Sequence, residues 1–306
     1  MTETWDCLVV GGGPAGLTAA VYLGRFRRRV LVVDGGDSRT GWIPRSHNLA
    51  GFPEGIAGPE LLDRLREQAT HYGGIVRPGR VDRIDRGDAG IFTATLGTGD
   101  TLRATTVVLA TGVVENPPPH ADLAEAVRSG RVRTCPICDG YEGIDQRIAV
   151  MGAGAHAAAE ALFLRTYTAR LTLLLVDDPA ALPGETRHQL DAAAIAVRQV
   201  RAGSLTLEDD GVTALCADDG QVHRFDIVYS AFGTASQSGL ARRLGARMDD
   251  DRRLLVDPHM ATSVPGLYAA GDLVRGLNQI SIAAGEAAIA ATAIHSHLPR
   301  VDASPG

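Results

Sequence analysis

Two cysteines and an acid stand close together in the segment RTCPICDGYEG, residues 133–143. Cys135 and Cys138 are separated by two residues, and Asp139 follows directly. Cysteines at this spacing hold zinc, cross-link a loop or carry two electrons as a dithiol–disulfide couple. The redox use needs a thiolate, and a Cys-x-x-Cys turn commonly lowers one thiol pKa to about 7 or below while the second sulfur stays within reach. The choice between these uses depends on what the rest of the chain binds.

Zinc is the least favoured of these uses, because a structural zinc site needs four ligands. Only one close cysteine pair is present, and His120 and His156 lack ligand spacing. Cys7 lies in an apolar run and Cys216 stands alone, so both are expected to be inert thiols. We therefore predict no metal site.

The first element that must serve a redox pair is a nucleotide-binding unit near the N-terminus. An apolar strand at residues 7–10 enters a glycine turn, a helix is expected to residue 23, and a second strand at 30–33 ends in an acid. The glycines suit a tight turn, close approach of a pyrophosphate and close helix packing, and the acid suits a ribose. This order of parts predicts a dinucleotide site that includes Gly11, Gly13, Pro14, Ala15, Gly16 and Asp34.

A second copy of this unit begins with a strand at residues 148–151 and the turn Gly152-Ala-Gly154. Ala157 replaces the third glycine, which is an accepted variant. The next strand, residues 171–176, ends in Asp177 and Asp178. These carboxylates repel a 2′-phosphate but accept hydrogen bonds from a free 2′-hydroxyl, so NADH is favoured over NADPH. The alternative is a degenerate copy that is kept for packing.

Two further segments are typical of ligand contacts. The strand-like run at 105–110 ends in the turn Thr111–Gly112, and the run at 267–270 ends in Gly271–Asp272. A long helix is expected to begin near Gln279. Its N-terminus would stabilise the negative charge that a flavin ring gains on reduction. Asp272 is placed to hold ribityl hydroxyls.

Composition narrows the class of protein. A chain of 306 residues is long enough for about two domains. The net charge of −6 argues against nucleic acid as a main partner. No apolar run reaches the ~20 residues of a membrane span, and the N-terminus lacks the charged lead of a signal peptide. We therefore expect a cytoplasmic protein with no membrane partner.

These motifs together resemble the low-molecular-weight, bacterial-type thioredoxin reductases and their flavin-dependent relatives, over essentially the whole chain. The matching parts are the two glycine turns, SHNLAGFP at 46–53, ATG at 110–112, CPICD at 135–139 and GLYAAGD…NQI at 266–280. The resemblance implies an α/β fold with two nested Rossmann-like, three-layer domains of the pyridine-nucleotide-disulfide oxidoreductase type. An FAD-binding domain would take residues 1–116 and 248–306, and an inserted nicotinamide-type domain would take residues 117–247 and carry the cysteines. The family is homodimeric with one FAD per subunit.

The resemblance also implies roles for single residues. Cys138 would face the flavin, Cys135 would exchange with substrate, and Asp139 would manage the proton. The residues that would line the flavin are Asn48, Asn278, Gln279 and Ile280.

This chain departs from the family in its second nucleotide unit. NADPH-dependent members carry a His-Arg-Arg sequence and a further arginine that clamp the 2′-phosphate, whereas this chain has LVDDPAA at 175–181. The donor is therefore NADH, NADPH without its clamp, or another reductant. The segments CDGYEG and LNQISIAAGEAAIA also look similar to flavin dithiol oxidases, but those enzymes commonly have His at the position of Asp139, which favours the reductases.

We therefore expect an FAD-dependent, thioredoxin-reductase-like disulfide oxidoreductase. It would move two electrons between flavin and the pair Cys135/Cys138, and on to a thioredoxin-like protein or a small-molecule disulfide. One alternative is a dithiol oxidase that forms disulfides with O2 as acceptor, and another is a reductase fed by a donor other than NADPH. A flavin-binding redox sensor without turnover is the non-catalytic alternative.

Overall fold

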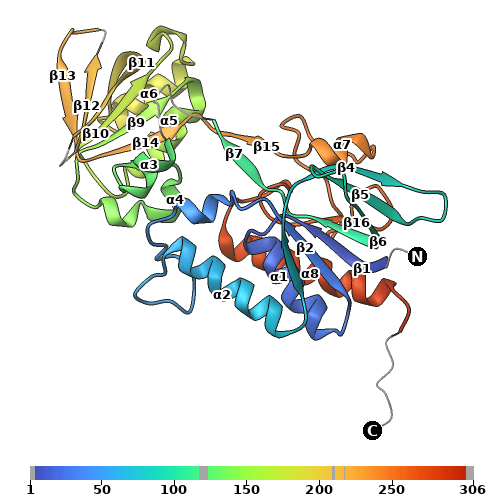
Figure 1. The fold of residues 1–306 in the computed structure, drawn as a ribbon. Helices are drawn as coiled ribbons and strands as arrows, with labels where there is room; N and C mark the ends of the chain where they lie inside the picture. Colours follow the sequence, from blue (N-terminus) through green and yellow to red (C-terminus); the bar gives the residue numbers. More distant parts are fainter. Residues whose placement is uncertain (1–3, 117–122, 209–210, 217, 301–306) are drawn as a thin grey trace. The chain divides into compact units, whose positions relative to one another are not determined.

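A computed structural model of the chain describes residues 4–116, 123–208, 211–216 and 218–300. The chain forms two compact units, each built around its own seven-stranded sheet (Figure 1). The first unit takes Met1–Gly41, Gly58–Val114 and Ala235–Gly306, and the second takes Trp42–Ala57 and Glu115–Thr234. The short strands β7 (Val113–Glu115) and β15 (Thr234–Ser236) pair with each other where the chain passes between the units.

The sheet of the first unit has the order β3-β2-β1-β6-β5-β4, and β16 also pairs with β6. Its strands β1, β2, β3, β6 and β16 run parallel, whereas β5 and β4 continue the sheet in antiparallel fashion. The strand bounds are β1 Thr4–Val10, β2 Val30–Asp34, β3 Ile75–Pro78, β4 Val81–Arg86, β5 Phe92–Leu96, β6 Thr101–Leu109 and β16 Leu267–Ala269.

Alternation along the strands builds two cores in this unit. Cys7 and Val9 of β1 pack with the helices α1 (Pro14–Arg25) and α8 (Ile280–His297). Leu8 and Val10 point to the opposite face, where they pack with residues of β4, β5 and α7 (Gly239–Arg243). Successive side chains of a strand face opposite sides, so a strand buried on both faces reads as a continuous apolar run. The remaining elements of this unit are η1 (Arg39–Trp42) and α2 (Gly58–His71).

The sheet of the second unit has the order β13-β12-β11-β10-β9-β14-β8. Strands β11, β10, β9, β14 and β8 are parallel, and β12 and β13 are added as an antiparallel hairpin. The strand bounds are β8 Val132–Arg133, β9 Ile148–Gly152, β10 Leu171–Leu175, β11 Ala196–Glu208, β12 Gly211–Cys216, β13 Val222–Phe225 and β14 Ile227–Ala231.

Helices cover this second sheet and lead into the cysteine segment. Ile148 and Val150 of β9 pack with α5 (Gly154–Leu164) and α6 (Gly184–Ala192) in one core cluster, whereas Ala149 and Met151 pack with β12 in another. The shorter helices are α3 (Leu123–Arg128), α4 (Pro136–Asp139), η2 (Tyr141–Gly143) and η3 (Pro179–Ala181).

The expected α/β fold with two Rossmann-like units is confirmed. The assignment of residues 1–116 and 248–306 to FAD and of 117–247 to a nicotinamide nucleotide stays a prediction, and residues 117–122 lie outside the described part of the chain. Within the described residues, no helix has both the length and the apolar character of a membrane span.

Candidate functional site

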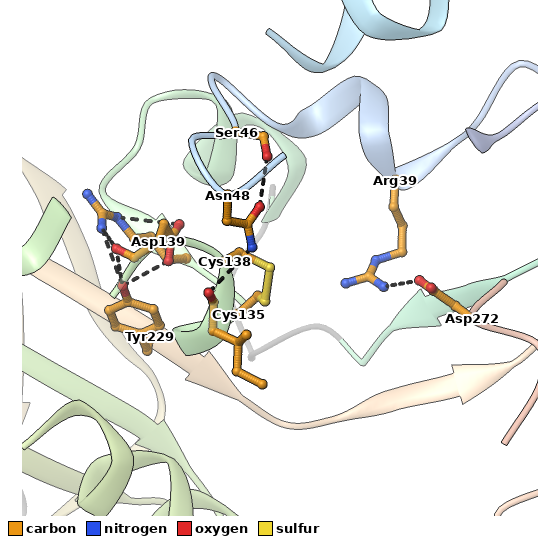
Figure 2. The surroundings of a disulfide bond; sticks show 10 residues. Arg39, Ser46, Asn48, Cys135, Cys138, Asp139, Tyr229 and Asp272 are labelled. Atoms are coloured by element: carbon orange, nitrogen blue, oxygen red, sulfur yellow. Dashed lines mark hydrogen bonds and ion pairs between the residues drawn. A yellow bond between two sulfur atoms is a disulfide. The ribbon is translucent and has the colours of Figure 1, made fainter. Parts of the chain in front are cut away.

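The cysteine pair lies at the start of a short helix in the second unit. β8 ends at Arg133, and Cys135 is the N-cap of α4, with Pro136 as the first helical residue. Proline suits this position because its fixed φ fits the helix and its missing N–H would have no helical partner there. Cys135 and Cys138 are joined by a disulfide with their Cα atoms 5.3 Å apart (Figure 2). The local turn therefore brings the sulfurs close enough to form and break a bond.

Asp139 is the last residue of this helix and forms polar contacts with two residues of the sheet, Tyr229 and Arg133. The Tyr229 hydroxyl donates a hydrogen bond to Asp139 Oδ1 at 2.9 Å (Figure 2). Arg133 donates to the Asp139 carbonyl oxygen at 2.6 Å, and its Nε lies 3.7 Å from Asp139 Oδ2. Burial raises the pKa of the Asp139 carboxyl to about 6, against the lowering effects of the Arg133 charge and the Tyr229 hydrogen bond. This carboxyl can therefore bind and release a proton near neutral pH.

Residues 42–57 contribute a segment that contacts the cysteine helix. Asn48 Nδ2 donates to the carbonyl oxygen of Ile137, which lies between the cysteines, at 3.5 Å, and Asn48 Oδ1 accepts from Ser46 Oγ at 3.0 Å (Figure 2). His47 Nδ1 lies 3.0 Å from Glu142 Oε1 in η2. The structure thus brings Asn48, which the resemblance places at the flavin, beside the disulfide.

The first glycine turn leaves no room for a side chain at Gly11 or Gly16. Gly11 has φ +113°, and a Cβ there would lie 2.3 Å from the Ala110 carbonyl oxygen. A Cβ on Gly16 would lie 1.9 Å from the Gly11 carbonyl oxygen. Helix α1 begins at Pro14 without a side-chain cap at Gly13, so its N-terminal N–H groups remain available to an anion.

Asp34 lies beside this turn at the end of β2. A Cβ on Gly12 would lie 2.1 Å from its carboxyl carbon, so the carboxylate occupies the space that glycine leaves. Asp34 Oδ1 accepts from the Gly36 N–H at 2.9 Å, and Arg66 approaches Oδ2 at 3.3 Å. The tight turn, the open helix N-terminus and the adjacent acid fit the pyrophosphate and ribose of FAD.

The other predicted flavin contacts of the first unit follow β6 and β16. A Cβ on Gly271, which has φ +82°, would lie 3.0 Å from Ala15 Cβ, so the end of β16 lies beside the first glycine turn. Asp272 forms an ion pair with Arg39 at 2.9 Å (Figure 2). Burial raises the pKa of Asp272, whereas Arg39 lowers it.

The remaining predicted flavin contacts of the first unit lie in the segment after β6 and at the start of α8. Thr111 Oγ1 donates to the carbonyl oxygen of Gln237 at 2.9 Å, and Gly112 has φ +63°. Gln279 is the N-cap of α8 without a side-chain cap bond, and Ile280 is the first helical residue. Asn278 accepts from Arg253 at 3.5 Å.

The second glycine turn forms a direct hydrogen bond with the acid that follows the next strand. The Gly154 N–H donates to Asp177 Oδ2 at 3.0 Å, and Gly154 has φ +56°. A Cβ on Gly152 would lie 2.8 Å from Ala157 Cβ, which shows how closely α5 packs on β9. Asp177 Oδ1 is buried without a partner among the described residues. An orphaned buried acceptor at this place fits a ribose hydroxyl.

Arg133, Tyr229, Glu142 and Arg39 are site residues that sequence reasoning missed. Tyr229 lies in the apolar strand β14, where a tyrosine is typical of core packing. Arg133 stands two residues before Cys135, and this proximity was the one available signal.

Comparison with known proteins agrees with this geometry. The family model described as pyridine nucleotide-disulphide oxidoreductase matches residues 5–287. The thioredoxin reductase of Mycolicibacterium smegmatis is 32% identical over 308 residues, which cover 94% of each chain. The crystal structure of HlmI has a TM-score of 0.88 at 30% identity and covers 97% of this chain and 93% of its own. The crystal structure of thioredoxin reductase from Streptococcus pyogenes MGAS5005 has a TM-score of 0.85 at 27% identity, with 97% and 98% covered.

A closed Cys-x-x-Cys disulfide, two Rossmann-like units and full-length similarity lead to one assignment. The chain belongs to the pyridine nucleotide-disulphide oxidoreductase family and is an FAD-dependent disulfide oxidoreductase of the thioredoxin reductase type.

Proposed function

We propose that this enzyme reduces the disulfide of a thioredoxin-like protein or of a small molecule through the couple Cys135/Cys138. The observation that carries the proposal is a disulfide at the N-terminus of a short helix that ends in a carboxyl with a pKa of about 6. Such a couple accepts two electrons, and a proton donor for the departing sulfur directly follows it in sequence.

The residues of the two glycine turns would hold the cofactors. Gly11, Gly13, Pro14, Ala15 and Gly16 would bind the FAD pyrophosphate, and Asp34 its adenosine ribose. When bound, FAD supplies two-electron transfer between a nicotinamide nucleotide and a disulfide. Further contacts to the flavin would come from Asn48, Thr111, Gly112, Gly271, Asp272, Asn278, Gln279 and Ile280.

The second turn would bind the electron donor. Gly152, Gly154 and Ala157 allow close approach of a pyrophosphate, and the free oxygen of Asp177 would accept from the ribose 2′-hydroxyl. Asp178 adds a second negative charge at the same strand end, which disfavours the 2′-phosphate of NADPH. We therefore propose NADH as the nucleotide donor.

The two cysteines and Asp139 have separate roles in the proposed reaction. Reduction of the disulfide consumes two electrons and yields two thiolates. Each thiolate then takes up a proton or stays ionised. We assign the flavin-facing position to Cys138 and the exchange with substrate to Cys135. Asp139 donates a proton to sulfur in its neutral form and accepts one in its ionised form.

An anaerobic single-turnover experiment tests this function. The flavin spectrum of the purified enzyme is followed after mixing with NADH, NADPH or no nucleotide, and thioredoxin disulfide or a small disulfide is added afterwards. We expect bleaching by NADH and reoxidation by the disulfide. Cys135→Ser and Cys138→Ser should each remove disulfide reduction, whereas Cys7→Ala, at a buried cysteine outside the site, should retain it.

Two other outcomes would replace the proposal. Peroxide formed from a dithiol under air without nucleotide would identify a dithiol oxidase. Bound flavin without turnover of any dithiol or disulfide would identify a redox sensor. We also propose a homodimer, which light scattering tests because the solution mass should be twice that of the chain.

A further inference from the structure

We propose that Arg133 and Tyr229 are positioning residues that fix the orientation and the protonation of the Asp139 carboxyl. This inference rests on the proposed redox role of Cys135 and Cys138 and refines it. It concerns two residues of the sheet, which act on the sulfur chemistry only through Asp139.

The register of the sheet brings these two residues together. β8 and β14 are parallel neighbours, and Tyr229 is the register partner of Arg133. Register partners on adjacent strands project from the same face of a sheet. Only one residue separates β8 from Cys135, so the strand that presents Arg133 also leads into the disulfide helix.

The hydrogen-bond donors around Asp139 can be assigned individually. Arg133 Nη1 donates to the Asp139 carbonyl oxygen at 2.6 Å and to the Tyr229 hydroxyl oxygen at 3.3 Å. Tyr229 has one hydroxyl hydrogen and two acceptors within reach, Asp139 Oδ1 at 2.9 Å and the same carbonyl at 3.1 Å. Because the guanidinium already serves the carbonyl, the tyrosine proton is left for the carboxylate.

The charged and hydrogen-bonding groups that face this carboxyl come from three elements. Arg133 of β8 and the Tyr229 hydroxyl of β14 lower its pKa, whereas burial and Glu142 of η2 raise it. Glu142 is itself paired with His47 at 3.0 Å. The pKa of Tyr229 is raised by burial and by Asp139, so its hydroxyl stays protonated and remains a donor at neutral pH. Removal of this hydroxyl should therefore move the Asp139 pKa upward.

A reaction that needs neither nucleotide nor natural substrate reports this pKa. A dithiothreitol thiolate attacks Cys135 Sγ, the disulfide bond breaks, and Cys138 leaves and takes the Asp139 proton. The second thiol of the reagent then displaces Cys135 and the reagent leaves as its cyclic disulfide, so two electrons pass from reagent to protein. The rate per reagent thiolate should fall as Asp139 loses its proton.

The experiment measures this rate between pH 5 and pH 8 on the anaerobic holoenzyme, by acid quench, alkylation and mass spectrometry of the peptide with Cys135 and Cys138. Wild type should show a midpoint near the Asp139 pKa of about 6. Tyr229→Phe keeps the buried ring and should raise the midpoint by roughly one pH unit, the size of one hydrogen bond to a charged group. Arg133→Gln should shift it in the same direction and serves as the second variant if Tyr229→Phe does not fold.

Tyr167→Phe is the matched control. The Tyr167 ring packs against the same helix, since a Cβ on Gly140 would lie 2.6 Å from it, and the variant should keep the wild-type midpoint. If Asp139→Asn abolishes the midpoint but Tyr229→Phe and Arg133→Gln leave it unchanged, the positioning role is wrong and the role of Asp139 stands. If Asp139→Asn keeps the wild-type midpoint, both the positioning role and the proton role of Asp139 are wrong. Failure of NADH to bleach the flavin would refute the proposed donor without touching this measurement.

Discussion

At the scale of single residues, the same thiol group has opposite chemistry in different surroundings. Cys135 and Cys138 lie at a helix start and form a disulfide. Cys7 and Cys216 are buried in the cores of the two units. Burial disfavours the charged thiolate, and it raises the pKa of Cys7 to about 12 and that of Cys216 to about 11. The sequence expectation that these two thiols are inert follows from this environment.

This difference predicts the pattern of thiol labelling. The thiolate is the reactive form of a cysteine, and with a pKa of about 11 only roughly one Cys216 in a thousand would be a thiolate at pH 8. We expect iodoacetamide to label neither Cys7 nor Cys216 in the native, oxidised protein. Brief reduction with dithiothreitol should expose Cys135 and Cys138 alone, as peptide mass spectrometry would show. Fast labelling of Cys216 before reduction would contradict its burial.

At the scale of elements, local patterns were predictable and long-range register was not. The glycine turn and the apolar run before it were enough to place β1 and α1, because the turn, the strand and the helix are contiguous in sequence. The pairing of Tyr229 with Arg133 joins residues 96 positions apart. No local pattern encodes that register, so the sequence located the cysteines and Asp139 but not the two residues that hold its carboxyl.

The acid that follows β10, Asp177, leads to a prediction about the nucleotide donor. Asp177 bonds the Gly154 N–H through one oxygen and leaves the other, buried oxygen without a partner among the described residues. Asp177→Asn should weaken NADH binding by roughly 10- to 100-fold, because a hydrogen bond to a charged acceptor is lost. The measurement is the NADH concentration that half-bleaches the flavin under anaerobic conditions.

Asp178→Asn is the neighbouring control for this prediction. Asp178 caps η3 by accepting from the Ala180 N–H at 2.8 Å, so its amide variant should change NADH binding little. Equal effects of the two variants would show that the charge of the strand end matters and that the free oxygen of Asp177 does not.

At the scale of the whole molecule, buried carboxyls set how stability depends on pH. Burial raises the pKa of Asp139 to about 6 and that of Glu160 to about 7, and it also raises those of Asp272 and Glu286. An acid whose pKa is higher in the folded state ionises first in the unfolded chain. The free energy of unfolding therefore falls as pH rises from the unfolded pKa to the folded one. For Glu160 this window runs from 4.5 to about 7.

Acids with lowered pKa values affect the free energy of unfolding in a different pH range. Asp85, Asp100, Asp219 and Asp226 have folded pKa values below 3.8, and their contribution is lost only as pH falls through that lower range. Between pH 5 and pH 8, the carboxyls with raised pKa values are therefore the acids that determine whether the free energy of unfolding rises or falls with pH. We expect the midpoint of thermal unfolding to fall as pH rises across this range.

Glu160→Gln tests one of these contributions. Glu160 Oε2 is buried without a partner among the described residues, and the charge of Glu115 adds to the rise of its pKa. The amide cannot ionise, so the fall in melting temperature between pH 5 and pH 8 should be smaller than in wild type. Glu185→Gln, on the exposed first turn of α6, should keep the wild-type fall. Circular dichroism melts across this range decide the matter, because an undiminished fall in Glu160→Gln would mean that Glu160 is ionised in the folded protein throughout.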